Sequence, residues 1–171
     1  MSVGSSELRV DALAKVTGRA EYPGDRSREG DLVAKVVFTN QPHARLRLLD
    51  VGKAKATPGV LAVLTSSDVP VNEYGLTMRD QPVFIGIENS GRSRVPSNIS
   101  RWEADHLALV VGESRDAVAI GAEAIVADWE ELPIIENIDE ALAFDAPLLH
   151  SENELATNVY QNYKIRKGNF L

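Results

Sequence analysis

Residues 106–130 read HLALVVGESRDAVAIGAEAIVADWE, and they contain the patterns of a strand, a helix and a second strand. The apolar run 106–111 has the length of a buried strand. Ser114 can cap the helix, because its hydroxyl can accept a hydrogen bond from a free N–H group of the first helical turn. Residues 125–130 then alternate, which predicts a strand with Ile125, Ala127 and Trp129 facing inward.

The expected helix after Ser114 has an unusually small apolar face. The residues that recur at helical spacing are Ala117, Ile120, Gly121, Ala124 and Ile125. Small side chains let a helix axis approach a sheet closely. We therefore expect this helix to cover a sheet rather than to bind a partner.

Further elements are expected on either side of this region. Alternation over 32–38 and 45–48 predicts two strands joined by a short turn, and the apolar run 60–64 predicts a strand buried on both faces. Short helices are expected after two caps, from Asp50 through Ala56 and from Asn137 through Ala143, the latter with Glu140 completing a capping box. This order of elements predicts an α+β (mixed α/β) domain, a mixed sheet covered by a few short helices.

The composition divides the chain into three parts. Residues 1–31 are polar, rich in turn formers, and predict an irregular arm with one short strand; 32–150 form the domain, and 151–171 an exit segment. Residues 71–101 show no clear periodicity, so we expect a long mobile connection. We interpret that connection, the arm and the tail after Ser151 as surfaces for other domains.

Charge and composition exclude several classes of function. The net charge of -7 over 171 residues argues against nucleic-acid and anionic-membrane partners, which clustered Lys and Arg would bind. The absence of cysteine excludes thiolate metal sites, ligation of iron–sulfur clusters and a Cys nucleophile. The sequence shows neither a secretory signal pattern nor an apolar run of about 20 residues, so we expect a cytoplasmic protein.

Residues that would carry chemistry are sparse. His43, His106 and His150 lack the paired spacing of a metal site, and no glycine-rich phosphate loop is present. We therefore expect no catalytic, cofactor-binding or metal-binding residue in this chain. His43 has two interpretations, a docking contact and a turn-closing hydrogen bond, of which the second is favoured. Trp102, beside Arg101, is either at the edge of the core or half of an interface.

A series of short motifs runs in order along nearly the whole chain. They include Arg9-Val10-Asp11, Lys15-Val16-Thr17-Gly18, Pro42-His43-Ala44-Arg45, Pro58-Gly59-Val60, Asp80-Gln81-Pro82, Arg101-Trp102, Trp129-Glu130, Asn158 and Lys167-Gly168. Together they resemble the N-terminal α/β-hammerhead domain of molybdenum hydroxylase large subunits, the xanthine dehydrogenase and aldehyde oxidase family. One departure is the stretch 103–106, where the family shows a Gly-Glu-Pro-like turn; Ala104 replaces the Gly and His106 the Pro, so we expect a changed turn or a shifted partner surface.

The resemblance implies a structural and interaction domain. In the family, the parent subunit holds a molybdopterin–molybdenum cofactor, iron–sulfur clusters and FAD reside in partner subunits or domains, and aldehydes, purines or N-heterocycles are hydroxylated with oxygen from water. The family's cofactor loops and catalytic Glu lie beyond the matched segment. The expected partners are thus the molybdopterin-binding domains of the same subunit and the iron–sulfur and FAD components, with His43, Arg45, Arg101 and Trp102 as candidate interdomain contacts. The alternative is a freestanding binding or scaffold module that shares the fold without oxidoreductase function.

Overall fold

A computed structural model describes residues 3–4, 6–75, 81–87, 96–152 and 156–168. The chain forms two compact units, Met1–Asp31 and Leu32–Leu171. The first unit contains helix α1 (Ala12–Val16) and a 3-10 turn at Pro23–Asp25, and its described residues form no strand. The short strand expected in the arm is therefore wrong. An ion pair of 2.7 Å between Asp11 and Lys15, one helical turn apart, favours the helix instead.

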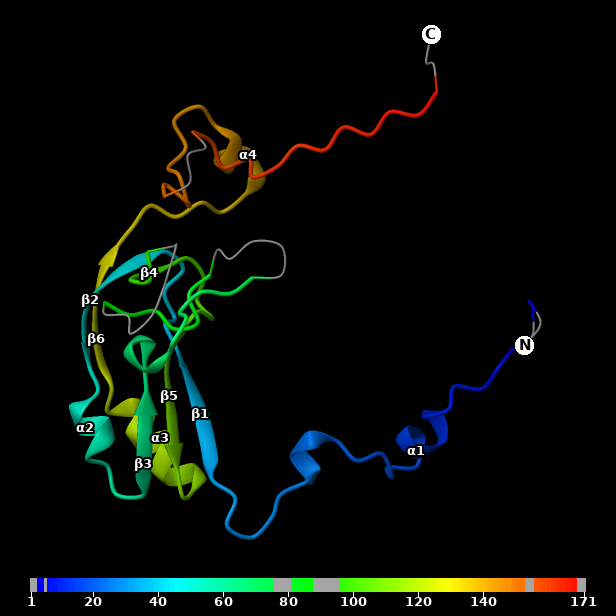
Figure 1. Ribbon diagram of the computed structural model, residues 1–171, viewed down its shortest axis with the longest axis vertical. Helices are drawn as coiled ribbons and strands as arrows, with labels where there is room; N and C mark the ends of the chain where they lie inside the picture. Colours follow the sequence, from blue (N-terminus) through cyan, green and yellow to red (C-terminus); the bar gives the residue numbers. More distant parts are fainter. Residues whose placement is uncertain (1–2, 5, 76–80, 88–95, 153–155, 169–171) are drawn as a thin grey trace. The chain divides into compact units, whose positions relative to one another are not determined.

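The second unit contains two three-stranded sheets (Figure 1). One has the order β1-β5-β3 and the other β4-β2-β6. Their strands are β1 (Val33–Phe38), β2 (Ala44–Asp50), β3 (Val60–Leu64), β4 (Ile99–Ser100), β5 (His106–Gly112) and β6 (Val126–Glu131). The ladders that join these strands within the described residues are all antiparallel.

The first two strands lie in different sheets, although they are close in sequence. β1 pairs with β5, whereas β2 pairs with β4 and β6. After β1 the backbone bonds to the turn that precedes β5: the Thr39 N–H donates to the Asp105 carbonyl over 2.8 Å, and the Asn40 N–H to the Glu103 carbonyl over 2.9 Å. Asn40 has a positive φ of 52°, which redirects the chain. The prediction of two strands joined by a short turn is confirmed, but they form no hairpin.

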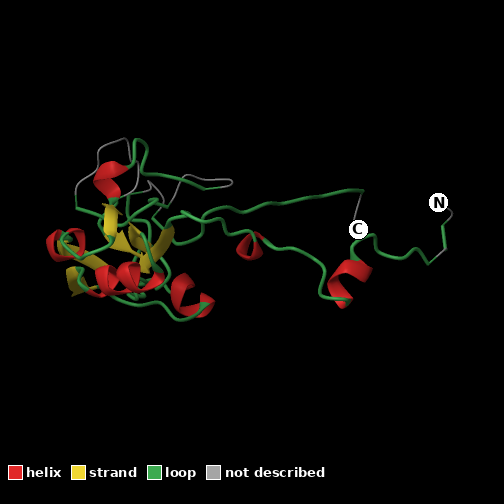
Figure 2. Ribbon diagram, turned by 90° about the horizontal axis from the view of Figure 1, so that it is seen from below, coloured by secondary structure: helices red, strands yellow, loops and turns green. Residues whose placement is uncertain are grey.

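In the described part of this unit, three short α-helices accompany the sheets, together with a 3-10 turn at Ser66–Asp68. The α-helices are α2 (Gly52–Lys55), α3 (Arg115–Glu123) and α4 (Ile138–Leu142). α3 contacts all three strands of the β1-β5-β3 sheet, and α2 contacts α3 and β3. Only short loops join α2 and α3 to their neighbouring strands, whereas longer irregular segments make up much of the rest of the chain (Figure 2). The expected α+β class with a few short helices is confirmed. None of the described helices is long and apolar enough to cross a membrane.

The cap of α3 forms as its sequence predicts. The Ser114 hydroxyl accepts a hydrogen bond of 3.1 Å from the Ala117 N–H. Ala117 and Gly121 are buried against the sheet, as expected. Ile120 is 59% exposed, so its assignment to the buried face is wrong.

Ser114→Ala is expected to lower the free energy of unfolding by about 0.5–2 kcal/mol, because one N–H group of the first turn loses its acceptor. Ser114→Asp keeps an acceptor and places a negative charge at the helix N-terminus, so its stability should stay close to wild type. Urea denaturation of the two variants checks this. If both variants lose the same free energy of unfolding, the hydrogen-bond acceptor at position 114 does not stabilise the helix.

Two core clusters lie on the two faces of β5. Ala108 and Val110 join Ala54, Val63 and Val118 beneath α3. Leu107 points the other way and packs with Leu46 and Ile85. The alternation follows from the period of two of a strand. β3 is less enclosed than expected, since Leu61 is 56% exposed and only Val63 is fully buried; its prediction as a strand buried on both faces is wrong.

Part of the connection 71–101 belongs to this core. Ile85 is fully buried, and its N–H donates to the His106 carbonyl over 2.7 Å. The buried Asn72 side chain bonds both backbone groups of Phe84 at 2.9 Å each. The interpretation of the connection as a surface for other domains is therefore wrong for these buried residues. Positions 76–80 and 88–95 of the connection lie outside the described residues.

Candidate functional site

The four candidate contact residues lie at one end of the β4-β2-β6 sheet. Ala44 of β2 pairs with Ser100 of β4 in an antiparallel ladder. His43, which precedes Ala44, and Arg101, which follows Ser100, therefore lie next to this pair at the same end of the sheet. Arg45 pairs with Ile99 on one side and with Glu130 of β6 on the other. The sheet register thus gathers residues that are far apart in sequence.

His43 is held inside this region. Its side chain is only 9% exposed, and Nδ1 lies 2.5 Å from the Pro133 carbonyl oxygen. Because a carbonyl can only accept, Nδ1 carries the proton in this hydrogen bond. The Leu132 N–H also donates to the His43 carbonyl over 3.0 Å. His43 therefore joins the start of β2 to the residues that follow β6. Its hydrogen bond lies within the chain, but it does not close the local turn as its sequence context had suggested.

Arg45 lies on the outer face of β2. Its Nε is 3.4 Å from Glu130 Oε2, and Arg47 forms an ion pair with the same carboxylate. All three side chains are more than a third exposed. Exposed pairs of this kind contribute little to stability, and about a third of the Arg45 side chain is open to solvent.

Arg101 is nearly buried, whereas its neighbour Trp102 is open to solvent. The Arg101 side chain is 13% exposed and contacts Leu149 and Glu152. Trp102 is 62% exposed. Both border a cavity of about 130 Å³ whose other lining residues are Gln81, Pro82, Asp105 and His150. Of the two interpretations of Trp102, its exposure favours an interface position.

A polar network that the sequence did not reveal supports the turn before β5. The Asp105 carboxylate accepts from the Arg101 N–H over 2.8 Å and from the Trp102 N–H over 3.2 Å. Beneath it, the buried Thr39 and Ser100 hydroxyls lie 2.8 Å apart. Thr39 and Ser100 are 61 positions apart, so no local motif links them. The one sequence signal that could have indicated this network is Asp105, because an Asp side chain that accepts hydrogen bonds from nearby backbone N–H groups favours a turn.

The turn tolerates both departures from the family pattern. Ala104 has no positive φ, unlike Asn40, so the backbone there does not require glycine. The His106 ring packs against Phe38 and Phe84, with ring centroids 5.6 and 6.4 Å apart. A changed turn is therefore not needed to accommodate these residues.

The described side chains bring together no catalytic constellation. No group of three or more His, Cys, Asp or Glu side chains is placed to hold a metal ion within the described ranges. The three histidines are used separately, since His43 bonds a carbonyl, His106 packs on aromatic rings and His150 contacts Glu152. A cavity of about 300 Å³ beside β2 is lined by apolar side chains, three hydroxyl residues and Lys55, and its described lining contains no carboxylate or imidazole. It offers no acid–base pair.

Similarity to known proteins places the chain in a family. A family model described as "Aldehyde oxidase and xanthine dehydrogenase, a/b hammerhead domain" matches residues 17–133. The chain is 32% identical over 167 residues to the nicotinate dehydrogenase large molybdopterin subunit of Eubacterium barkeri, covering 97% of this chain and 36% of that protein. It is 31% identical over 143 residues to the xanthine dehydrogenase of Oryza sativa, covering 82% of this chain and 10% of that protein.

Solved structures agree with these sequence relatives. The aldehyde oxidoreductase from Desulfovibrio gigas superimposes with a TM-score of 0.69 at 28% identity, over 84% of this chain and 16% of that one. The CO dehydrogenase from Oligotropha carboxidovorans gives a TM-score of 0.68 at 29% identity, over 85% of this chain and 17% of that one. The chain spans about a third or less of the length of each of these four proteins. The chain belongs to the α/β-hammerhead domain family of aldehyde oxidase and xanthine dehydrogenase.

Proposed function

We propose that the chain is the structural and interaction domain of a molybdopterin-dependent oxidoreductase of the xanthine dehydrogenase and aldehyde oxidase type. The observation that carries this proposal is the alignment of 97% of the chain with 36% of a large molybdopterin subunit. The parent subunit would hydroxylate an aldehyde, a purine or another N-heterocycle with oxygen from water, in the cytoplasm.

The cofactors are proposed for the parent enzyme and not for this chain. With no cysteine in the sequence, the donor set does not fit an iron–sulfur cluster. The described residues also lack a cluster of metal-ligating side chains. We therefore place molybdopterin in the remaining domains of the subunit, and iron–sulfur clusters and FAD in partner subunits or domains.

Exposed apolar side chains support an interaction role. In α1, Leu13 and Val16 are 70% and 80% exposed, and the helix has no buried residue. In the exit segment, Tyr163 and Ile165 are 77% and 93% exposed. Apolar side chains that are this exposed, with more than one in a short segment, are typical of surfaces that another protein segment covers. We propose that the arm 1–31, the segment 151–171, Arg45 and Trp102 contact the molybdopterin-binding domains and the electron-transfer components.

The complete reading frame that encodes this sequence provides the test. The full polypeptide and the 171-residue chain are produced in the same cofactor-competent host, and molybdenum and pterin are quantified in both. Stoichiometric molybdenum in the full polypeptide and none in the chain is the expected result. A frame without further large-subunit sequence, in itself or beside it, would instead support a freestanding scaffold module. Stoichiometric molybdenum in the 171-residue chain would contradict the proposed division of roles.

A further inference from the structure

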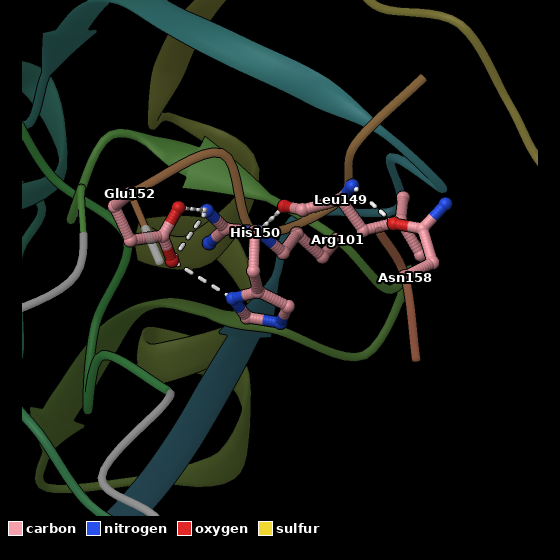
Figure 3. Close-up of polar contacts among 5 residues, drawn as sticks. All are labelled: Arg101, Leu149, His150, Glu152 and Asn158. Atoms are coloured by element: carbon pink, nitrogen blue, oxygen red, sulfur yellow. Dashed lines mark hydrogen bonds and ion pairs between the residues drawn. The ribbon is translucent and has the colours of Figure 1, made fainter. Parts of the chain in front are cut away.

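The backbone of Leu149 is bonded on both sides by side chains, that of Arg101 from 48 positions earlier in the sequence and that of Asn158 from 9 positions later. Its carbonyl accepts a hydrogen bond of 2.7 Å from Arg101 Nε, and its N–H donates to Asn158 Oδ1 over 3.0 Å (Figure 3). Arg101 directly follows β4, while Leu149 and Asn158 lie after α4. The two backbone groups of this one residue thus connect the end of a sheet to the loop that leaves it.

Arg101 holds the same loop at a second point. Its Nη2 lies 3.3 and 3.2 Å from the two carboxylate oxygens of Glu152, and His150 Nδ1 lies 2.8 Å from Glu152 Oε1 (Figure 3). The Arg101 and Glu152 side chains are only 13% and 14% exposed. An ion pair this far from solvent is poorly screened, so removal of either the Arg101 cation or the Glu152 carboxylate should weaken the attachment of the loop.

Asn158 closes the loop on itself. Its Nδ2 donates to the carbonyls of Ala141 and Pro147 over 3.1 and 3.0 Å, while its Oδ1 accepts from Leu149. The end of α4, the middle of the loop and the start of the exit segment therefore meet at one carboxamide. Such side-chain bonds substitute for the secondary structure that the loop lacks.

We propose that Arg101, His150, Glu152 and Asn158 form a clasp that fastens residues 141–152 to the end of β4, fixes the direction in which the chain leaves the sheets, and opens in acid. This clasp is a property of the domain itself, and it stands whether or not the proposed function is correct. Asn158 organises the loop, and Arg101 with Glu152 attaches the loop to the sheet.

The pH dependence follows from the surroundings of Glu152. Burial, the largest influence, would raise the pKa of Glu152, but the hydrogen bonds from His150 and its own backbone, with the charges of Arg101 and His150, hold this pKa below its ordinary value of 4.5. A lowered pKa means that the carboxylate stabilises the clasp fully above about pH 4.5, and that this contribution is lost as the pH falls through the folded-state pKa. Asp105 is a further charged group that lines the cavity beside Arg101 and His150.

Hydrogen exchange of the 171-residue chain at neutral pH tests the clasp. Arg101→Gln removes the cation and Glu152→Gln mimics protonation; in either variant, exchange across 143–152 should accelerate at least about tenfold while β5 keeps its protection. Arg47→Gln is the matched control, because Arg47 forms an exposed pair with Glu130. Asn158→Ala should accelerate exchange of the Leu149 amide even with Arg101 intact.

Unchanged exchange of 143–152 in both Arg101→Gln and Glu152→Gln would overturn the proposal, as would equal acceleration in Arg47→Gln. If Arg101→Gln unfolds the domain, β5 will exchange as well, and Glu152→Gln then decides. The pKa of Glu152, measured by NMR in the wild-type chain, gives an independent readout. A value below 4.5 is expected, and a value at or above it would contradict opening in acid.

Discussion

Ile85→Ala is expected to lower the free energy of unfolding of the chain by about 2–5 kcal/mol. Ile85 is fully buried and packs with Leu46 of β2 and Leu107 of β5. Its truncation would leave a cavity between strands of the two sheets, and the surrounding side chains can fill such a space only in part. Urea denaturation monitored by tryptophan fluorescence measures the change, with Trp129 at the edge of the same cluster as reporter.

Ile87→Ala is the matched control for this prediction. Ile87 lies two residues along the same connection and is 49% exposed. The same side-chain truncation there should cost less than about 1 kcal/mol. If Ile85→Ala and Ile87→Ala lower the free energy of unfolding by the same small amount, Ile85 is not a core residue. The connection would then be the mobile interface that its composition suggested.

Gly121→Leu is expected to destabilise the chain by about 1–3 kcal/mol. A Cβ at position 121 would lie 2.7 Å from Val60 Cγ2 and 3.2 Å from Val110 Cγ1, both closer than normal contact distances. The remaining atoms of leucine would push α3 further from the β1-β5-β3 sheet. The gain in helix propensity over glycine, about 1 kcal/mol, offsets only part of this cost.

Lys55→Leu provides the comparison for Gly121→Leu. Lys55 is an exposed residue of α2, so the same new side chain meets solvent rather than a sheet. Its free energy of unfolding should change by no more than about 0.5 kcal/mol. Equal denaturation midpoints for the two variants would show that position 121 does not face the sheet as described.

For the candidate site, the sequence selected four residues that the fold brings close together, while their role as interdomain contacts stays a prediction. His43, Arg45, Arg101 and Trp102 lie at one end of a sheet, as the β2–β4 ladder shows. His43 and Arg101 are largely buried and bond within the chain, whereas Arg45 and Trp102 remain accessible. Burial of a polar side chain depends on residues far away in sequence, which a local motif does not contain.

The sequence by itself determined the elements whose signals are local. The strand, the capped helix and the second strand of 106–130 were predicted because hydrophobic periodicity and a capping hydroxyl act over only a few residues. The ordered motifs along the chain also identified the family, as the match over residues 17–133 confirms. The small face of α3 was visible for the same reason, since Ala117 and Gly121 recur one helical turn apart.

Only the tertiary structure decided how these elements combine. The separation of β1 and β2 into two sheets depends on backbone bonds from Thr39 and Asn40 to residues 103–105. The burial of Ile85 depends on Leu46 and Leu107, and the clasp depends on contacts between Arg101 and residues 48 and 51 positions later. Each of these outcomes is set by pairwise contacts across long loops. The free energy of these contacts is gained only when folding brings distant residues together, so no local pattern in the sequence predicts it.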